Sequence, residues 1–277
     1  MKSICIKTNN ANYLSYLLNE LNCCNLESLC FSENHFKNYK NIIIHYTGNN
    51  YSDFFSTISC LLSLLVIDEI EKTLFNNILI QSYFYFDLKE RKSIIDLCDN
   101  IMSEDFSNSF NTKYNFLYNA FYNYISTNHN LVLDGFINFR LGEYISFLDD
   151  VIDEAVNVFV VEQEYLEFIS LLKIYISSMQ SGIDCVHLIY ENNSPILFDE
   201  NKKEINILDN LNKQKYLSDI SFSTNDYVLN TLLNLLPQKI YIQLLDDNYP
   251  TDFITTLTLI FEDRISVCIE ENQGKTN

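Results

Sequence analysis

The spacing of apolar residues changes twice along this chain and divides it into three parts. In residues 1–50, short runs with alternating apolar positions flank one stretch with helical spacing. This pattern predicts a strand at Ser3–Lys7, a helix at Asn12–Leu21 and two further strands around Leu26–Phe31 and Asn41–Tyr46. The first part is therefore predicted to be a small αβ unit.

The second part, residues 51–180, is predicted to be a helical region because its apolar residues recur at three- and four-residue steps. Its longest apolar run, Ile58–Ile67, is far shorter than the roughly 20 residues that a membrane span needs, so we interpret it as a buried helix. Asp87 and Glu90 have the spacing of a capping box, in which two side chains accept hydrogen bonds from backbone N–H groups. A new helix is therefore predicted to begin near Leu88.

The third part, residues 181–277, changes to a period of two beyond Gly182. Its first half predicts an antiparallel meander of three strands, at Ile183–Tyr190, Pro195–Asp199 and Glu204–Leu208. Its second half alternates helix, strand, helix, strand, at Ser223–Leu236, Lys239–Leu245, Pro250–Asp263 and Ile265–Ile269. The last strand–helix–strand unit fits a right-handed crossover between parallel strands.

Together, the three parts predict an α+β protein with a small N-terminal αβ unit, a central helical region and a C-terminal mixed α/β sheet lobe. We place the domain boundaries near residues 50 and 180. No low-complexity linker marks either boundary, so one integrated domain remains an alternative.

The composition excludes several classes of function. The chain contains five glycines and carries a formal net charge of −19. Phosphate-binding loops need glycine where φ is positive, so the scarcity of glycine argues against nucleotide-binding loops. The negative charge repels nucleic acids, whose phosphates are bound mainly by Lys and Arg. We therefore expect no nucleic-acid partner.

The eight cysteines do not have the spacing of a metal site. No C-x-x-C pair occurs, and Cys23, Cys24 and Cys30 cluster without a histidine at the spacing of a zinc finger. The segment Met1–Asn10 is too short and too polar for the apolar core of a signal peptide. We therefore interpret the cysteines as reduced thiols of a cytoplasmic protein, and we predict neither a metal site nor a cofactor.

Several sequence blocks carry a resemblance to a known family. They comprise Glu69–Arg91, Phe136–Tyr144, Asp153–Phe159, Val161–Leu172 and Ile183–Ile189. These blocks resemble the YtxC-like family, whose members are described as sporulation proteins, and the similarity extends from about Leu61 to Glu262. The resemblance implies a cytoplasmic protein of a spore-forming bacterium that is associated with sporulation. It supplies no reaction and therefore no catalytic residue.

Arg140 is the first candidate binding residue. It is one of three arginines and lies in the apolar stretch Phe136–Leu141. A guanidinium in such surroundings either forms a buried ion pair with a carboxylate or reaches water at the end of its aliphatic stem. Glu143 at i+3, and Glu162 and Glu164 farther along, are the candidate carboxylates. In an open pocket, the same group would instead bind an anionic ligand.

A run of acidic residues follows Arg140 and places like charges at i and i+4 on one helix face. It consists of Asp149, Asp150, Asp153 and Glu154. Such a group binds a hard cation or forms a solvated face that meets a basic partner. Because no histidine lies on that helix and no calcium-loop spacing is present, we favour the solvated face.

His187 is predicted on a strand between Val186 and Leu188. Its imidazole would serve as a general acid or base only beside a nucleophile or a substrate in a cleft. Neither G-x-S-x-G nor H-E-x-x-H is present. We therefore favour a structural role for His187 and keep it as a ligand-binding candidate.

Two hypotheses from different classes remain open. The first is a non-enzymatic protein that binds another protein through an acidic helical surface, with self-association through apolar helix faces left open. It predicts an exposed apolar patch rimmed by carboxylates. The alternative is an uncatalogued enzyme or small-ligand receptor with a pocket between the helical region and the C-terminal sheet. It predicts that Arg140, Glu162, Glu164 and His187 converge there.

Overall fold

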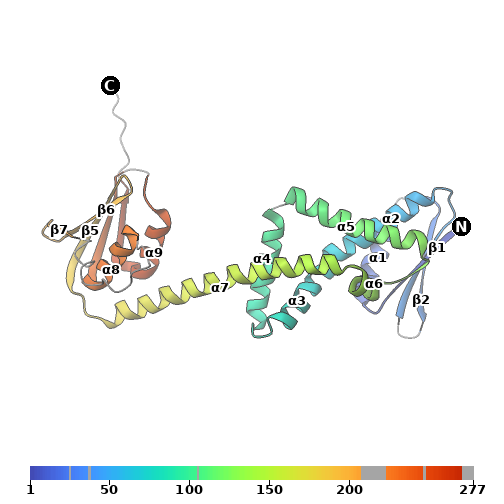
Figure 1. Ribbon diagram of the computed structural model, residues 1–277, viewed down its shortest axis with the longest axis horizontal. Helices are drawn as coiled ribbons and strands as arrows, with labels where there is room; N and C mark the ends of the chain where they lie inside the picture. Colours follow the sequence, from blue (N-terminus) through green and yellow to red (C-terminus); the bar gives the residue numbers. More distant parts are fainter. Residues whose placement is uncertain (25, 37–38, 105, 207–222, 246–247, 270–277) are drawn as a thin grey trace, which may run out of the picture. The chain divides into compact units, whose positions relative to one another are not determined.

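The protein divides into two compact units, each with its own hydrophobic core. The structure is a computed structural model that describes residues 1–24, 26–36, 39–104, 106–206, 223–245 and 248–269. The first unit is Met1–Val161 and the second is Glu162–Asn277. Both units combine helices with one sheet, which confirms the predicted α+β class (Figure 1).

The first unit contains a four-stranded sheet with the order β2-β3-β1-β4. Its strands are β1 (Lys2–Thr8), β2 (Leu29–Phe36), β3 (Tyr39–Tyr46) and β4 (Asn130–Val132). β1 pairs antiparallel with β3 and places Ile4 opposite Ile44 and Ile6 opposite Ile42. All four isoleucines are buried, because alternate residues of each strand point to the same face of the sheet.

β4 is a short strand that the sequence analysis did not predict. It pairs parallel with β1, with Leu131 opposite Ile6, and it lies far along the chain from the other three strands. Leu131 is buried in the same hydrophobic core as the sheet and the helices of this unit. Residues of the predicted N-terminal αβ unit and of the predicted helical region thus share one sheet and one core.

The helices of the first unit follow the predicted periodicity closely. They are α1 (Ala11–Cys23), α2 (Tyr51–Leu65), the π-helix η1 (Val66–Ile70), α3 (Glu71–Ser82), α4 (Leu88–Glu104), α5 (Phe106–Thr127), α6 (Leu133–Arg140) and the first part of α7 (Gly142–Ser178). The predicted capping box at the start of α4 is confirmed. The N–H of Glu90 donates to the carboxylate of Asp87 at 2.9 Å, and the N–H of Asp87 donates to the carboxylate of Glu90 at 2.7 Å.

The second unit contains a five-stranded mixed sheet with the order β7-β6-β5-β8-β9. Its elements after α7 are β5 (Ile183–Glu191), β6 (Ser194–Asp199), β7 (Glu204–Ile205), α8 (Thr224–Leu235), β8 (Pro237–Leu244), α9 (Thr251–Phe261), the 3₁₀ turn η3 (Glu262–Arg264) and β9 (Ile265–Ile269). The predicted meander is confirmed, because β5, β6 and β7 pair antiparallel. Residues 207 and 208, included in the third predicted strand, lie outside the described residues.

Helices α8 and α9 cover one face of this sheet (Figure 1). That face presents Val186, Leu188 and Tyr190 of β5, which are fully buried. β8 pairs parallel with both β5 and β9, and α9 connects β8 to β9, so the predicted parallel strand–helix–strand unit is confirmed. The capping box that starts α8 joins Ser223 and Asp226.

Candidate functional site

One side of α7 in the second unit is held against the core of that unit. Ile169 and Ile176, seven residues apart, are buried in the cluster formed by the sheet, α8 and α9. The hydroxyl of Tyr165 lies 2.9 Å from the hydroxyl of Thr256 in α9. The ammonium group of Lys173 lies 2.6 Å from the carboxylate of Glu262. These contacts fix the rotation of this part of α7 about its axis.

The opposite side of the same segment exposes large apolar residues. Leu171 is 65% exposed and Ile174 is 64% exposed, and Phe168 and Tyr175 are 49% and 39% exposed. Glu164, Phe168, Leu171 and Tyr175 share one side because they follow each other at steps of four, three and four residues. Glu167 lies beside this row, four residues before Leu171. We call these six residues (Glu164, Glu167, Phe168, Leu171, Ile174 and Tyr175) the α7 outer face.

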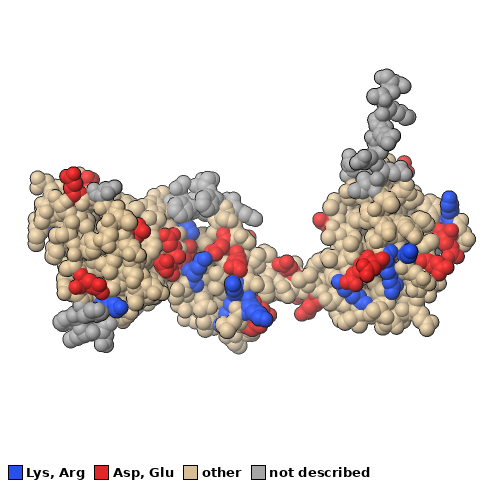
Figure 2. All heavy atoms as spheres, turned by 180° about the vertical axis from the view of Figure 1, so that it is seen from behind, with Lys and Arg blue, Asp and Glu red and all other residues tan. Residues whose placement is uncertain are grey.

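The α7 outer face has its negative charge at one end. Glu164 and Glu167 are exposed and lie at its N-terminal end, whereas the rest of the face is apolar. The nearby cation, Lys173, points to the other side of the helix and pairs with Glu262. Elsewhere, Asp and Glu side chains spread over the visible face of both units, with Lys and Arg side chains among them (Figure 2).

Arg140 does not form the buried ion pair that the apolar surroundings suggested. It is the last residue of α6 and is exposed, and among the described residues it has no salt bridge. Its aliphatic stem thus carries the guanidinium to solvent, the second of the two arrangements considered. Arg140 is the one charged residue lining a hollow of about 320 Å³ between α5 and α6, with Tyr124 and Asn128 among its neighbours.

The other three predicted binding residues belong to the second unit. Glu162 and Glu164 are exposed on α7. His187 lies on β5, opposite Phe198 of β6 and Tyr241 of β8. Its ring stacks on Tyr241 with a centroid distance of 5.1 Å and an interplanar angle of 21°. This stacking covers one face of the imidazole.

The acidic run of α7 in the first unit lies on its solvent side. Asp149, Asp150, Asp153 and Glu154 are all exposed. The hydroxyl of Tyr83 donates a hydrogen bond to Asp153 at 2.5 Å, and this bond, with burial, raises the pKa of Tyr83 to about 12. Among the described side chains, no group of three or more His, Cys, Asp or Glu is arranged to hold a metal ion.

A buried polar cluster of the first unit joins three helices. Glu71 begins α3, Lys113 comes from α5 and Tyr144 from α7. The ammonium group of Lys113 lies 3.2 Å from Oε2 and 3.3 Å from Oε1 of Glu71. The hydroxyl of Tyr144 donates a short hydrogen bond to Oε1 of the same carboxylate. Glu71 and Tyr144 are only 5% and 3% exposed.

The electrostatics of this cluster are dominated by burial. Burial raises the pKa of Glu71, because a carboxylate loses its hydration there, while Tyr144 and Lys113 partly offset the rise. Burial and the adjacent Glu71 also raise the pKa of Tyr144. None of Glu71, Lys113 and Tyr144 lines one of the three pockets found among the described residues, so no pocket there would bring a substrate to them. The cluster therefore has the composition of a structural connection between three helices, and we call Glu71, Lys113 and Tyr144 the polar lock.

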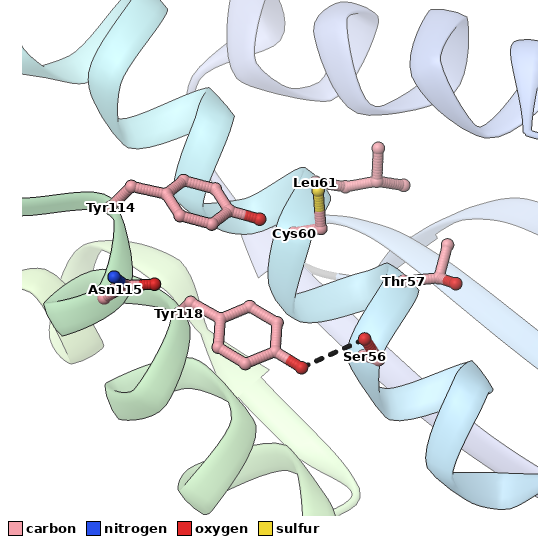
Figure 3. A pocket seen from close by; sticks show the side chains of 7 residues that line it. All are labelled: Ser56, Thr57, Cys60, Leu61, Tyr114, Asn115 and Tyr118. Carbon is pink, nitrogen blue, oxygen red and sulfur yellow. Dashed lines mark hydrogen bonds between the residues drawn. The ribbon is translucent and has the colours of Figure 1, made fainter. Parts of the chain in front are cut away.

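A shallow pocket of about 530 Å³ lies between α2 and α5 (Figure 3). Tyr114 and Tyr118 of α5 direct their hydroxyl groups toward α2, and Tyr118 donates to the hydroxyl of Ser56 at 3.0 Å. Burial and a hydrogen bond with Cys60 raise the pKa of Tyr114. All seven lining residues are uncharged, so the pocket can offer hydrogen bonds but has no pair of groups poised for acid–base chemistry.

Sequence reasoning missed Glu71, Lys113 and Tyr144, although a signal was present for two of them. Glu71 precedes the buried Phe75 and Leu79 at steps of four, so it occupies an apolar position of α3. Tyr144 likewise precedes the buried Leu148 by four residues. A charged or hydroxyl-bearing residue in such a position requires a buried partner. The identity of the partner, Lys113, had no comparable signal.

These features describe an α+β protein with a buried polar lock in one unit and an exposed apolar helix face in the other. The sequence profile of the YtxC-like family matches residues 56–266, which is most of the 277-residue chain. The chain therefore belongs to the YtxC-like family. The polar lock and the α7 outer face both lie within the matched range.

One curated relative is the "Uncharacterized protein YtxC" of Bacillus subtilis (strain 168). It is 25% identical to this chain over 137 residues, which is 48% of this chain and 46% of the relative. The match thus spans less than half the length of that protein. No solved structure matches the chain significantly.

Proposed function

We propose that this protein acts by binding another protein through the α7 outer face. The observation that carries the proposal is the exposure of Phe168, Leu171, Ile174 and Tyr175 on one side of a helix whose other side is fixed to a core. Contiguous apolar patches on a protein surface usually mark interaction sites, because leaving them in water is unfavourable. Aromatic and large aliphatic side chains of this kind are typical of the centre of such interfaces.

Glu164 and Glu167 add selectivity to this surface. Carboxylates at the rim of an interface contribute mainly to orientation and to the rate of encounter. The structure offers no comparable support for the enzyme or receptor alternative. The alternative requires Arg140, Glu162, Glu164 and His187 to line one pocket. Among the pockets found in the described residues, the hollow beside Arg140 contains one of the four, and the others contain none.

We place this binding in the cytoplasm of a sporulating cell. The association with sporulation comes from the resemblance to the YtxC-like family and not from the geometry of the chain. Each of the eight cysteines is a free thiol, which agrees with a reducing compartment.

None of the helices in the described ranges has the length and apolarity that crossing a membrane requires.

Affinity capture from sporulating cells tests the proposal. The bait is the full chain, compared with the double variant L171S/I174S, which removes apolar surface without emptying the core. The matched control is L166S, because Leu166 is also an exposed leucine of α7, 45% exposed, but lies off the α7 outer face. We expect a partner that wild type and L166S retain and L171S/I174S loses.

Two outcomes would contradict the proposal. One is retention of the same partners by L171S/I174S at wild-type levels. The other is the absence of any stoichiometric partner of the wild-type chain under conditions in which it remains folded. Circular dichroism of each variant establishes that a loss of capture does not come from unfolding.

A further inference from the structure

The arrangement of charge on the α7 outer face indicates the kind of partner it fits. We infer that this face binds an amphipathic helix whose apolar seam carries Lys and Arg at one end. The inference rests on the proposed function and adds to it the chemistry and the orientation of the partner. Three properties of the face carry it: its spacing, its length and the position of its carboxylates.

The spacing suits a helix laid along α7. Glu164, Phe168, Leu171 and Tyr175 follow the alternation of three- and four-residue steps that is used where two helices pack side by side. Ile174 widens the apolar row toward one side. An extended strand would use only every second residue and has no sheet edge to join on a helix.

The length of the face sets the size of the partner segment. Glu164 and Tyr175 are eleven positions apart on α7, which corresponds to about 17 Å along the helix axis. A partner helix therefore needs a seam of about three turns to cover it. Such a short seam gives a modest apolar contact, so complementary charge at its end has a measurable share in affinity.

The carboxylates determine the polarity of the complex. Glu164 and Glu167 are both exposed at the N-terminal end of the face, and the one lysine of α7 in the second unit, Lys173, is paired with Glu262 on the other side. A partner helix with Lys or Arg beside the first turn of its seam places these cations near the two carboxylates. With the reverse orientation, the cations would lie beside the uncharged Ile174–Ser178 end.

A second copy of this chain is a poorer occupant than a basic helix. Each copy carries a formal charge of −19, so two copies repel each other at moderate salt. Side-by-side parallel packing of two α7 outer faces would also bring Glu164 and Glu167 of one copy against the same residues of the other. An anionic lipid surface is disfavoured by the same charge.

Three synthetic peptides test this inference on the full chain. Each has the same three-turn seam of leucines and a fluorescent label, and the first turn carries two Lys, two Gln or two Glu on the flanks of the seam. We expect the Lys peptide to bind at least about tenfold more tightly than the Gln peptide in 0.1 M salt, and the Glu peptide to bind least. Raising the salt concentration should reduce the difference between the Lys and Gln peptides.

Matched variants separate the α7 outer face from the general acidity of the chain. E164Q/E167Q and D149N/D150N change the net charge equally, but only the first pair belongs to the face. We expect E164Q/E167Q to lower the affinity for the Lys peptide about fivefold and to leave the affinity for the Gln peptide unchanged. D149N/D150N should leave both unchanged. A photo-crosslinker at the basic end of the peptide should label the chain near Glu164.

The outcomes distinguish this inference from the proposed function. Equal affinity for the Lys and Gln peptides, both lost in L171S/I174S, would overturn the inference and leave the proposed function standing. Equal weakening by E164Q/E167Q and D149N/D150N would overturn it as well. A dimer in sedimentation that L171S/I174S dissociates would replace the basic helix by a second copy. If no peptide binds and cell capture shows no dependence on the face, both proposals fail.

Discussion

The ammonium group of Lys113 lies 3.2 Å from a carboxylate oxygen of Glu71, and the two side chains are only 10% and 6% exposed. Tyr144 donates a hydrogen bond to the same carboxylate. Three helices of the first unit therefore meet at one buried carboxyl group. Lys113 and Tyr144 both donate hydrogen bonds to the Glu71 carboxylate in a place with little water. Removing the carboxylate therefore leaves both donors without an acceptor.

We expect E71A to destabilise the protein strongly. The substitution leaves the Lys113 ammonium and the Tyr144 hydroxyl buried without their acceptor. Breaking a buried pair in this way costs about 3–5 kcal/mol. Urea unfolding followed by circular dichroism measures the change. A loss below about 1 kcal/mol, the level of an exposed pair, would contradict the buried pairing.

We expect the double variant E71M/K113M to be less destabilised than the sum of E71M and K113M. Each single variant leaves one uncompensated charge, whereas the double variant removes both charges and keeps apolar volume. The coupling energy from a double-mutant cycle should be about 1–3 kcal/mol. The same cycle with the exposed pair Lys72 and Asp99, whose side chains are 67% and 41% exposed, serves as the control and should give a coupling near zero.

Stability should depend on pH through Glu71 in a defined direction. Burial raises the pKa of Glu71 in the folded protein above its ordinary value of 4.5, so the folded state holds this proton more tightly than the unfolded state. The stabilising contribution of this tighter proton binding to the free energy of unfolding is then fully present below pH 4.5. It is lost as pH rises through the raised pKa of Glu71.

The isosteric variant E71Q, which does not titrate, isolates this effect from the other carboxylates. We expect the unfolding free energy of wild type minus that of E71Q to fall as pH rises above 4.5. Urea titrations from acidic to neutral pH measure this difference. A difference that rises with pH would show that Lys113 and Tyr144 outweigh burial and that the pKa of Glu71 is lowered.

Ser223 is expected to contribute to the stability of the second unit. Its side chain accepts the N–H of Asp226 at 3.2 Å, and the Asp226 carboxylate accepts the N–H of Ser223 at 2.7 Å. S223A removes this N-cap and should cost about 1 kcal/mol, whereas S223D should retain most of the stability. Thermal unfolding of both variants distinguishes the loss of the cap from a general intolerance of this position.

The elements that depend on neighbouring residues were predictable from the sequence. The capping box of Asp87 and Glu90 and the hairpins of the C-terminal lobe are encoded within a few residues and have the predicted form. β4 was not predictable, because its three residues acquire strand geometry only by pairing with β1. The buried lock depends on Lys113 and Tyr144, which are 42 and 73 residues from Glu71.

The candidate site was predictable only in kind. An acidic, apolar helical surface was expected, but periodicity cannot tell which apolar stripe of a helix remains uncovered. Ile169 and Leu171 are only two positions apart, yet Ile169 is 3% exposed and Leu171 is 65% exposed. Arg140 shows the same limit, because its apolar neighbours suggested burial whereas the short helix α6 ends there and exposes it.

The π-helix η1 shifts the buried row of α3 by one residue relative to the buried row of α2. Ile58, Leu62, Val66 and Ile70 are buried at steps of four residues, whereas the buried row of α3, which is Glu71, Phe75 and Leu79, begins one residue later. The N–H of Glu71 bonds to the carbonyl of Val66, five residues earlier. The turn thus absorbs one surplus residue. A chain lacking one of residues 67–69, none of which is buried, would form an ordinary helical turn and still direct Glu71 inward, so this segment can lose a residue without losing the order of its buried side.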